Sequence, residues 1–223
     1  MKVLTTMNLL RAKAGFCRDR IAALAYRLGG NWGDDTPIPI LNILWSLSLK
    51  DALWALRAVL PEQEDERDRV VRFLLSDFVE RVLPLYEREH IGDGRPRKAV
   101  NMARRFAASR ATGAELARSR AAAIAAWDEN GDPEARAAAW VCDENPARAA
   151  GAVQCETVSA AGAAADAEAW DPEAAEAAED ARAEGKDAWD AQEGAFQARL
   201  GAEATERAWQ TERLRAVLDG GEL

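Results

Sequence analysis

The chain has 223 residues, of which 48% are hydrophobic, and its formal net charge is −9 at pH 7. This length allows one large domain or two small ones. The acidic balance argues against direct nucleic-acid binding, because domains with that function are usually basic. No apolar run reaches the ~18 residues that a membrane-spanning helix needs, and the N-terminal segment lacks the apolar stretch and cleavage site of a signal peptide. We therefore expect a soluble, cytoplasmic protein.

Charge and side-chain size are distributed unevenly along the chain. Residues 1–120 contain 21 Lys and Arg against 15 Asp and Glu, whereas residues 121–223 contain 8 against 23. Large apolar side chains concentrate before residue 110, and alanine fills 30 of the 80 positions in residues 121–200. We therefore predict two parts, a well-packed N-terminal helical domain over residues 1–120 and an acidic, Ala- and Trp-rich helical region over residues 121–223.

The first segment of the chain has a helical pattern. Apolar residues recur at helical spacing over residues 3–28, and the pair Gly29-Gly30 ends this predicted helix. Residues 31–39 contain two prolines separated by one residue. Because proline cannot continue a helix interior, we expect this segment to be a loop.

Two shorter helices are predicted next. Pro39 opens the first, which covers residues 40–48. Ser48 is a candidate N-cap for the second, with Asp51 three residues later in the position of a capping box. This second helix is expected to end before Pro61.

A long helix and a helical hairpin follow. Residues 62–68 are rich in acidic side chains, which suit the positive end of a helix dipole. Pro84 lies inside an otherwise helical pattern, so we expect a kink there rather than an end. Residues 91–94 are predicted to form a turn, and Pro96 lies in the first turn of the next helix, where proline is tolerated. That helix is expected to run to residue 108.

The rest of the chain is predicted to form Ala-rich helices. Thr112 and Glu115 have capping-box spacing and open a helix that continues to Trp127. The last helix covers residues 202–218, and residues 152–158 are the only short candidate for a strand. Further breaks are expected at residues 130–133, 145–146, 151, 162 and 171–172.

These patterns together predict an all-α protein. We expect a helical bundle or an array of helical hairpins with an Ala-rich helical C-terminal extension. The tryptophans of the extension are expected to be core anchors, because alanine lets helix backbones approach closely and each indole then supplies buried area. They are Trp127, Trp140, Trp170, Trp189 and Trp209.

Searches for catalytic patterns find none. The sequence has no Gly-rich phosphate loop and no GxSxG motif. Its three cysteines, at positions 17, 142 and 155, form no CxxC pair, and His90 is the only histidine, which argues against a Cys/His zinc site. We expect His90 to lie on the surface at a helix C-terminus. We therefore predict that the protein is not an enzyme and has no catalytic residues, metal or cofactor.

A basic cluster at the start of the predicted hairpin helix has two interpretations. Arg95, Arg97 and Lys98 could contact phosphates or a partner protein, since helix N-termini bind anions. Alternatively, the two arginines form ion pairs with acidic side chains of the hairpin and fasten it, which we consider the better interpretation. The candidate acidic partners are Glu87, Glu89 and Asp93.

Two other segments are candidate partner-binding surfaces. Trp32 is expected to be the most exposed tryptophan, and with Asp34 and Asp35 beside it the loop would suit a binding hot spot. The second candidate is an acidic helix face whose residues are three to five positions apart or adjacent. Its members are Glu173, Glu176, Glu179, Asp180 and Glu184.

Residues 50–218 resemble an immunity protein family found in bacteria and phages. The resemblance rests on the helix sequence ERVLPLYE at residues 80–87, on RPRKA at residues 95–99 and on WQTERLRAVL at residues 209–218. Gly94 departs from the pattern, because the family usually has an acidic residue before the Arg-Pro-Arg. The prolines and glycines within residues 128–185 also depart from the long alanine stretches of the family.

The resemblance implies a function in immunity, which is the binding and neutralisation of a toxin. We therefore expect a non-enzymatic immunity or antitoxin-type protein that masks a protein partner, which its acidic surface would suit if the partner is basic. An alternative is a phage-encoded inhibitor of host defence, such as an anti-CRISPR protein. A further alternative, of another class, is a structural helical protein with no inhibitory role.

Overall fold

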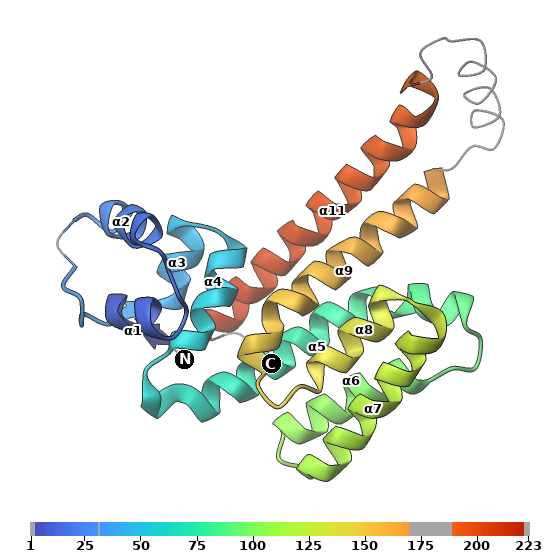
Figure 1. Ribbon diagram of the computed structural model, residues 1–223, viewed down its shortest axis with the longest axis horizontal. Helices are drawn as coiled ribbons and strands as arrows, with labels where there is room; N and C mark the ends of the chain where they lie inside the picture. Colours follow the sequence, from blue (N-terminus) through green and yellow to red (C-terminus); the bar gives the residue numbers. More distant parts are fainter. Residues whose placement is uncertain (1–2, 31, 170–188, 221–223) are drawn as a thin grey trace.

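The protein is all-α, with one two-residue pair of strands, in the computed structural model, which describes residues 3–30, 32–169 and 189–220. Figure 1 shows three parts: a small N-terminal lobe, a body of helices, and a long pair of helices that projects from the body. No helix in the described part of the chain combines the length and the apolar character needed to cross a membrane.

The N-terminal lobe is less regular than the sequence pattern predicts. The predicted helix over residues 3–28 is wrong as a continuous element, because the Thr6 side chain accepts a hydrogen bond from the Leu9 N–H and helix α1 begins only after it. Gly15, with φ +63°, then separates α1 from α2. The elements are β1 (Leu4–Thr5), α1 (Met7–Ala12), α2 (Arg18–Arg27), β2 (Ile38–Pro39), α3 (Ile40–Ser46) and α4 (Leu49–Ala55). The two strands pair antiparallel, Leu4 with Pro39 and Thr5 with Ile38.

The body is built around one long helix. Two 3₁₀ turns, η1 (Leu56–Ala58) and η2 (Pro61–Gln63), lead into α5 (Glu64–Glu89), which continues through Pro84 as expected. Helices α6 (Arg95–Ala107), α7 (Gly113–Asn130) and α8 (Pro133–Val141) follow and form the rest of the body. Helix α5 packs against α6, α8 and α9, and its buried face includes Leu74, Leu75 and Phe78.

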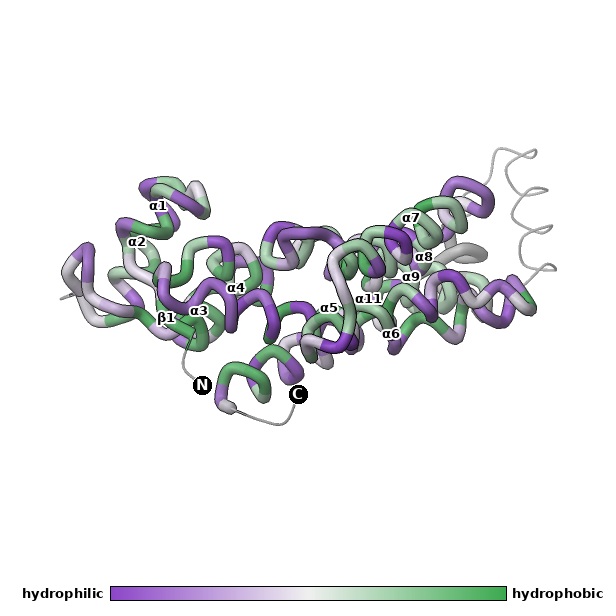
Figure 2. Tube along the Cα trace, turned by 90° about the horizontal axis from the view of Figure 1, so that it is seen from below, coloured by the Kyte–Doolittle hydropathy of each residue, from purple (hydrophilic) through white to green (hydrophobic). Residues whose placement is uncertain are grey.

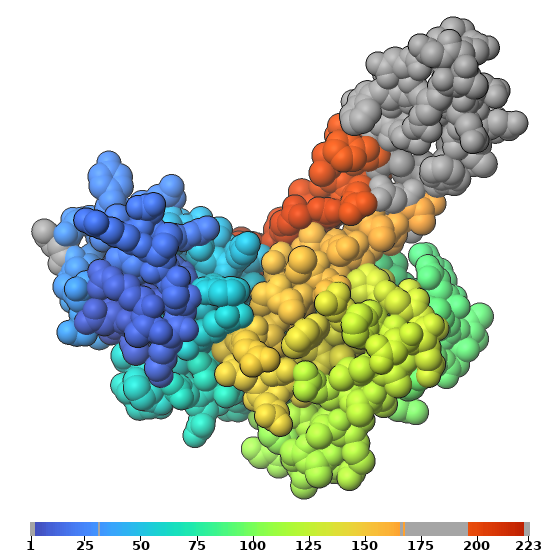
Figure 3. Space-filling model, viewed as in Figure 1, coloured from blue at the N-terminus to red at the C-terminus, as the bar shows by residue number. Residues whose placement is uncertain are grey.

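Helices α9 (Pro146–Ala169) and α11 (Trp189–Leu218) form the projecting pair, which Figure 3 shows diverging from the N-terminal lobe. The predicted breaks at Gly151 and Gly162 and the strand candidate at residues 152–158 are wrong, because α9 runs through all of them. Gly162 instead allows α9 and α11 to approach closely, because a Cβ on it would lie 2.9 Å from Cγ of Glu203 on α11. A Cβ on Gly151 would make only an ordinary van der Waals contact, at 4.0 Å from the Trp54 ring.

One cluster of buried residues extends from Val3 in the lobe to Leu218 at the end of α11. Figure 2 shows apolar and polar stretches alternating along the helices, as expected of helices that bury one face. The predicted division at residue 120 falls inside α7. The lobe, the body and the base of the projecting pair therefore share a core.

Both predicted capping signals are confirmed. The Ser48 hydroxyl accepts a hydrogen bond from the Asp51 N–H at 3.1 Å at the start of α4. At the start of α7, the Thr112 hydroxyl accepts from the Glu115 N–H, and the Glu115 carboxylate accepts from the Thr112 N–H at 2.7 Å. These bonds satisfy N–H groups that have no partner within their own helix.

Replacing Thr112 with alanine should lower the free energy of unfolding by about 1 kcal/mol, because it removes the hydroxyl that caps α7. Urea denaturation followed by circular dichroism would measure the change. Ser119→Ala, in the middle of the same helix, is the control and should alter stability by less than about 0.5 kcal/mol. Equal effects of the two substitutions would contradict a capping role for Thr112.

Candidate functional site

Arg95 is held by two carboxylates at the start of α6. Its Nε and Nη2 donate to Oδ1 and Oδ2 of Asp93 at 2.9 and 2.7 Å, and its Nη1 donates to Oε1 of Glu129 on α7 at 2.9 Å. Asp93 also accepts from the Tyr86 hydroxyl at 2.6 Å. This arrangement ties the turn after α5 to α7.

Arg97 makes a second bidentate pair within the hairpin. Its Nε and Nη2 each lie 2.8 Å from a carboxylate oxygen of Glu87 on α5, and its Nη1 lies 3.3 Å from Oε1 of Glu80. The predicted fastening of the hairpin is thus confirmed for Glu87 and Asp93. Lys98, the third basic residue of the cluster, is exposed.

These contacts change the acidity of the carboxyl groups. The hydrogen bond from Arg95 holds the pKa of Asp93 well below its usual value, and the hydrogen bond from Arg97 lowers the pKa of Glu87. Both acids are therefore charged in the folded protein at neutral pH, and both arginines are already occupied by internal partners.

Asp77, on α5, joins three helices. Its Oδ1 accepts from Nη2 of Arg104 on α6 at 2.6 Å, and its Oδ2 lies 2.6 Å from Nη2 and 2.8 Å from Nε of Arg213 on α11. The Asp77 side chain is only 18% exposed. The RPRKA helix and the C-terminal WQTERLR helix, which carry the family resemblance, are therefore bound to the same carboxylate.

The C-terminal helix also packs on α5 through Trp209. The edge of its ring meets Phe78 at a centroid distance of 5.9 Å, and the guanidinium of Arg81 lies 4.7 Å from its ring centroid. Arg81 donates in turn to Glu206 at 2.6 Å. Trp209 is thus a partly buried anchor, as expected, and so are Trp127 and Trp140. The side chains of Trp170 and Trp189 lie outside the described residues.

His90 is the C-cap of α5, so its predicted place at a helix C-terminus is confirmed. Its side chain is half-buried, however, and not on the open surface as the sequence predicts. Its Nε2 lies 2.7 Å from Oδ2 of Asp132 at the start of α8, and its ring lies against Tyr86 with a centroid distance of 4.5 Å. Glu89 brings a third donor atom within 4.8 Å of these two groups. The histidine is engaged in joining α5 to α8.

The loop after Trp32 is exposed over residues 33–37, but the Trp32 ring is not its exposed point. Trp32 is half-buried against the core, and its Nε1 donates to the Leu28 carbonyl at 2.8 Å, so the prediction of an exposed ring is wrong. The indole finds a partner at the end of the preceding helix, which lets it fold back. Asp34 pairs with Arg11 at 2.8 Å, and Asp35 accepts from an asparagine of α1.

The acidic candidates all lie outside the described residues. They are Glu173, Glu176, Glu179, Asp180 and Glu184. Their part in binding stays a prediction.

The structure exposes two other tryptophans that sequence reasoning missed, Trp45 and Trp54, at 56% and 38%. Trp54 is nevertheless held in place, because its Nε1 donates to the Ala14 carbonyl and the Arg57 guanidinium lies 3.6 Å from its ring centroid. Local pattern places both residues on predicted helices and gives no signal that one side of each ring stays open.

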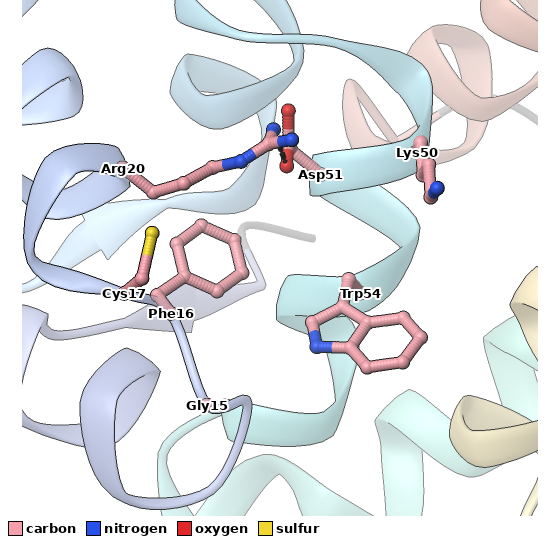
Figure 4. A pocket seen from close by; sticks show the side chains of 7 residues that line it. All are labelled: Gly15, Phe16, Cys17, Arg20, Lys50, Asp51 and Trp54. Carbon is pink, nitrogen blue, oxygen red and sulfur yellow. Dashed lines mark hydrogen bonds and ion pairs between the residues drawn. The ribbon is translucent and has the colours of Figure 1, made fainter.

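Trp54 borders a hollow of about 360 Å³ between the α1–α2 connection and α4, shown in Figure 4. Phe16 forms its apolar wall, and Arg20 and Lys50 supply positive charge. Arg20 is ion-paired with Asp51, which also lines the hollow. We call this hollow the Trp54 site. It offers a fixed aromatic ring beside the exposed cation Lys50, since the charge of Arg20 is already paired with Asp51.

Comparison with known proteins identifies one family. Residues 61–144 match a family described as "Imm-5 like putative immunity protein". The matched segment contains the hairpin and Asp77, and it ends before the C-terminal helix. No curated protein and no solved structure gives a significant match. The match confirms the family resemblance inferred from the sequence for residues 61–144, which include ERVLPLYE and RPRKA, and it does not extend to WQTERLRAVL at residues 209–218.

Replacing Asp77 with asparagine should lower the free energy of unfolding by about 2 kcal/mol, because Arg213 then loses its contact with a carboxylate through two nitrogens and, among the described residues, Arg104 keeps only its contact with Glu80 on α5. Chemical denaturation would measure the loss. Asp219→Asn is a matched control, since its contact with Arg215 is exposed and 3.8 Å long, and it should cost less than about 1 kcal/mol. A similar loss in both variants would show that Asp77 has no special structural role.

Replacing Arg95 with alanine should destabilise the protein most at neutral pH. Because Arg95 lowers the pKa of Asp93, the pair stabilises the fold fully above the ordinary carboxyl pKa of about 4 and loses its effect as pH falls through the lowered value. The difference in unfolding free energy between the parent and Arg95→Ala should therefore shrink on acidification. Urea titrations at neutral pH and at about pH 3 test this. A difference that stays constant, or that Lys98→Ala reproduces, would contradict it.

Proposed function

We propose that the protein is a non-enzymatic immunity protein that binds a toxin and neutralises it by masking its working surface. The observation that carries this proposal is the match of residues 61–144 to the immunity family. A binding protein of this kind needs a rigid scaffold and an accessible contact surface, and it needs no reacting groups. The core shared by the lobe and the body would supply such a scaffold, and so would the hairpin that the ion pairs of Arg95 and Arg97 hold together.

The toxin-binding surface is proposed to lie away from the basic hairpin. Arg95 and Arg97 already hold internal carboxylates, and breaking such pairs to bind a partner would leave charges without partners. These two arginines are accordingly assigned to stability. Of the three basic candidates, only Lys98 remains as an exposed contact.

The Trp54 site is the proposed anchor point for the toxin. Tryptophan and arginine are enriched among the few interface residues that carry most binding energy. The Trp54 ring is ordered before binding by its contacts with Ala14 and Arg57, so little side-chain entropy is lost on association. Residues 1–60 contain 8 Lys and Arg against 4 Asp and Glu. This surface therefore suits a toxin segment that presents an apolar or aromatic side chain beside a carboxylate.

An alternative contact uses the acidic part of the chain. Residues 121–223 hold 8 Lys and Arg against 23 Asp and Glu and would steer a basic partner, whether a toxin or a nucleic-acid-directed defence complex. The two proposed contacts differ in what weakens binding. If the toxin is anchored at Trp54, removal of this ring should lower the affinity. If the acidic region captures the toxin, the affinity should fall as salt concentration rises and should not change when Trp54 is replaced.

Trp54→Ala should weaken binding to the toxin about 30-fold, which corresponds to a hot-spot contribution of about 2 kcal/mol. The experiment co-expresses the protein with the product of its neighbouring gene in a bacterial host, scores growth, and measures the dissociation constant with purified partners. Tyr26→Ala is the control, because Tyr26 is an aromatic residue of the same lobe, is 84% exposed and does not line the Trp54 site.

Three outcomes distinguish toxin binding at the Trp54 site from binding at the acidic region. Rescue of growth by the parent protein, lost in Trp54→Ala but kept in Tyr26→Ala, supports toxin neutralisation through this site. Rescue that persists in Trp54→Ala but falls steeply with salt in the binding assay assigns the contact to the acidic region. Failure of the parent protein to bind or protect would rule out the neighbouring product as its target.

A further inference from the structure

Arg72 is a buried cation without an ionic partner in the described part of the chain. It lies on α5 and is only 3% exposed. Its Nη1 donates to the carbonyl of Val141 at 2.6 Å, and its guanidinium lies 5.2 Å from the ring centroid of Phe106. Asp68 and Asp143 act on its charge from beyond ion-pair distance. Burying a guanidinium without a directly paired carboxylate is costly, so a bound anion at this position would be stabilised by the unpaired charge.

Two hollows meet at this residue. One of about 420 Å³ lies between α6, α7 and the α8–α9 connection, and one of about 750 Å³ lies at the start of α5 and the α6–α7 turn. Arg72, Phe106 and Glu144 line both. We call the smaller hollow the Arg72 pocket. All of its lining residues fall within the segment matched to the immunity family.

The Arg72 pocket combines positive charge with an apolar wall. Leu116 and Ile124 of α7 line it together with Phe106. Arg120 is a second cation in the lining. One of its nitrogens, Nη2, pairs with Asp143 at 2.8 Å, and its Nε is buried with no hydrogen-bond partner among the described residues. The Arg120 side chain is 35% exposed, so part of its guanidinium remains open to the pocket.

We propose that the Arg72 pocket binds a small monocarboxylate with an apolar chain. The carboxylate lies between Arg72 and Arg120, as guanidinium groups favour, and the chain lies against Leu116, Ile124 and Phe106. A single negative charge is preferred, because Glu144 lines the pocket and further acidic residues line the adjoining hollow. Phosphate and dicarboxylates would be repelled there. This site is independent of the toxin contact at Trp54.

The one cysteine in the pocket lining, Cys142, is not expected to react with a bound ligand. Burial raises the pKa of its thiol to about 12, and its Sγ donates to the Ala99 carbonyl at 3.3 Å. The thiol is therefore neutral at physiological pH and supplies no nucleophile.

Arg72 has one competing role, which the test must separate. Val141 is the last residue of α8, and a guanidinium that donates to its carbonyl stabilises a helix C-terminus. A purely structural arginine would lower stability when removed and would leave no ligand affinity to lose.

The test titrates the full-length protein with hexanoate and phenylacetate by calorimetry and by thermal shift. Hexanamide, which has the same apolar chain without the charge, and inorganic phosphate serve as comparison ligands. We expect hexanoate or phenylacetate to bind and to raise the melting temperature. Hexanamide and phosphate should bind about tenfold more weakly or not at all, as the loss of one charge-assisted hydrogen bond implies. Absence of binding by both acids, or equal binding of hexanoate and hexanamide, overturns the proposal.

Two variants localise the binding. Arg72→Met should abolish it, and Arg69→Met, on the same helix but outside the pocket lining, should not. Ala121→Phe fills the pocket from an exposed position of α7, and Ala114→Phe is its control on the same helix. If Arg72→Met does not fold, Ala121→Phe alone decides. Binding that survives Ala121→Phe, or is lost equally in Ala114→Phe, would place the carboxylate elsewhere and overturn the assignment.

Discussion

A single carboxylate, that of Asp77, connects the central helix to the two helices whose sequences are most distinctive. Its two oxygens hold Arg104 on α6 and Arg213 on α11, which are separated by more than a hundred positions in the chain. Because the group is mostly withdrawn from water, these pairs are less screened than surface pairs. This carboxylate therefore adds a partly buried polar link between the hairpin, the body and the base of the projecting helix pair to the apolar core that they share. The basic motif is best understood as part of that scaffold.

The arginines of this protein divide into two physical classes. Arg95 and Arg97 meet carboxylates in bidentate geometry, and their charge is used within the fold. Arg72 is more deeply buried, and among the described residues its guanidinium contacts a carbonyl and an aromatic ring but pairs with no carboxylate. The carboxylates that pair with Arg95 and Arg97 balance their charge, so no ligand is needed there. The charge of Arg72 is not balanced by a paired carboxylate among the described residues. For this reason we infer an anion site at the Arg72 pocket and not at the cluster of Arg95, Arg97 and Lys98.

Local sequence signals predicted much of the fold correctly. The caps at Ser48 and Thr112, the helical hairpin and the pairing of Arg97 with Glu87 all depend on residues close in sequence. The errors have tertiary causes. Gly151 and Gly162 favour helix breaks in the sequence, yet α9 runs through both, and at Gly162 the missing Cβ leaves room for Glu203 of α11. Trp32 is predicted to be exposed, yet its ring packs on the core, and its indole N–H donates to the Leu28 carbonyl four residues earlier. The packing of α11 on α9 and of the Trp32 ring on the core is not specified by sequence spacing.

The sequence alone determined the all-α class, the starts of α4, α6 and α7, the hairpin and the resemblance to an immunity family, because helix periodicity, capping and ion pairs within about ten residues are local properties. The last helix, predicted over residues 202–218, in fact begins at Trp189. Only the tertiary structure decided which side chains remain accessible and which charges remain without a partner. Trp54 gained its place beside Phe16 through the packing of α4 against the α1–α2 connection. Arg72 has no ionic partner among the described residues, because the end of α8 offers it a carbonyl and not a carboxylate. Both facts follow from contacts across many residues, which no local pattern specifies.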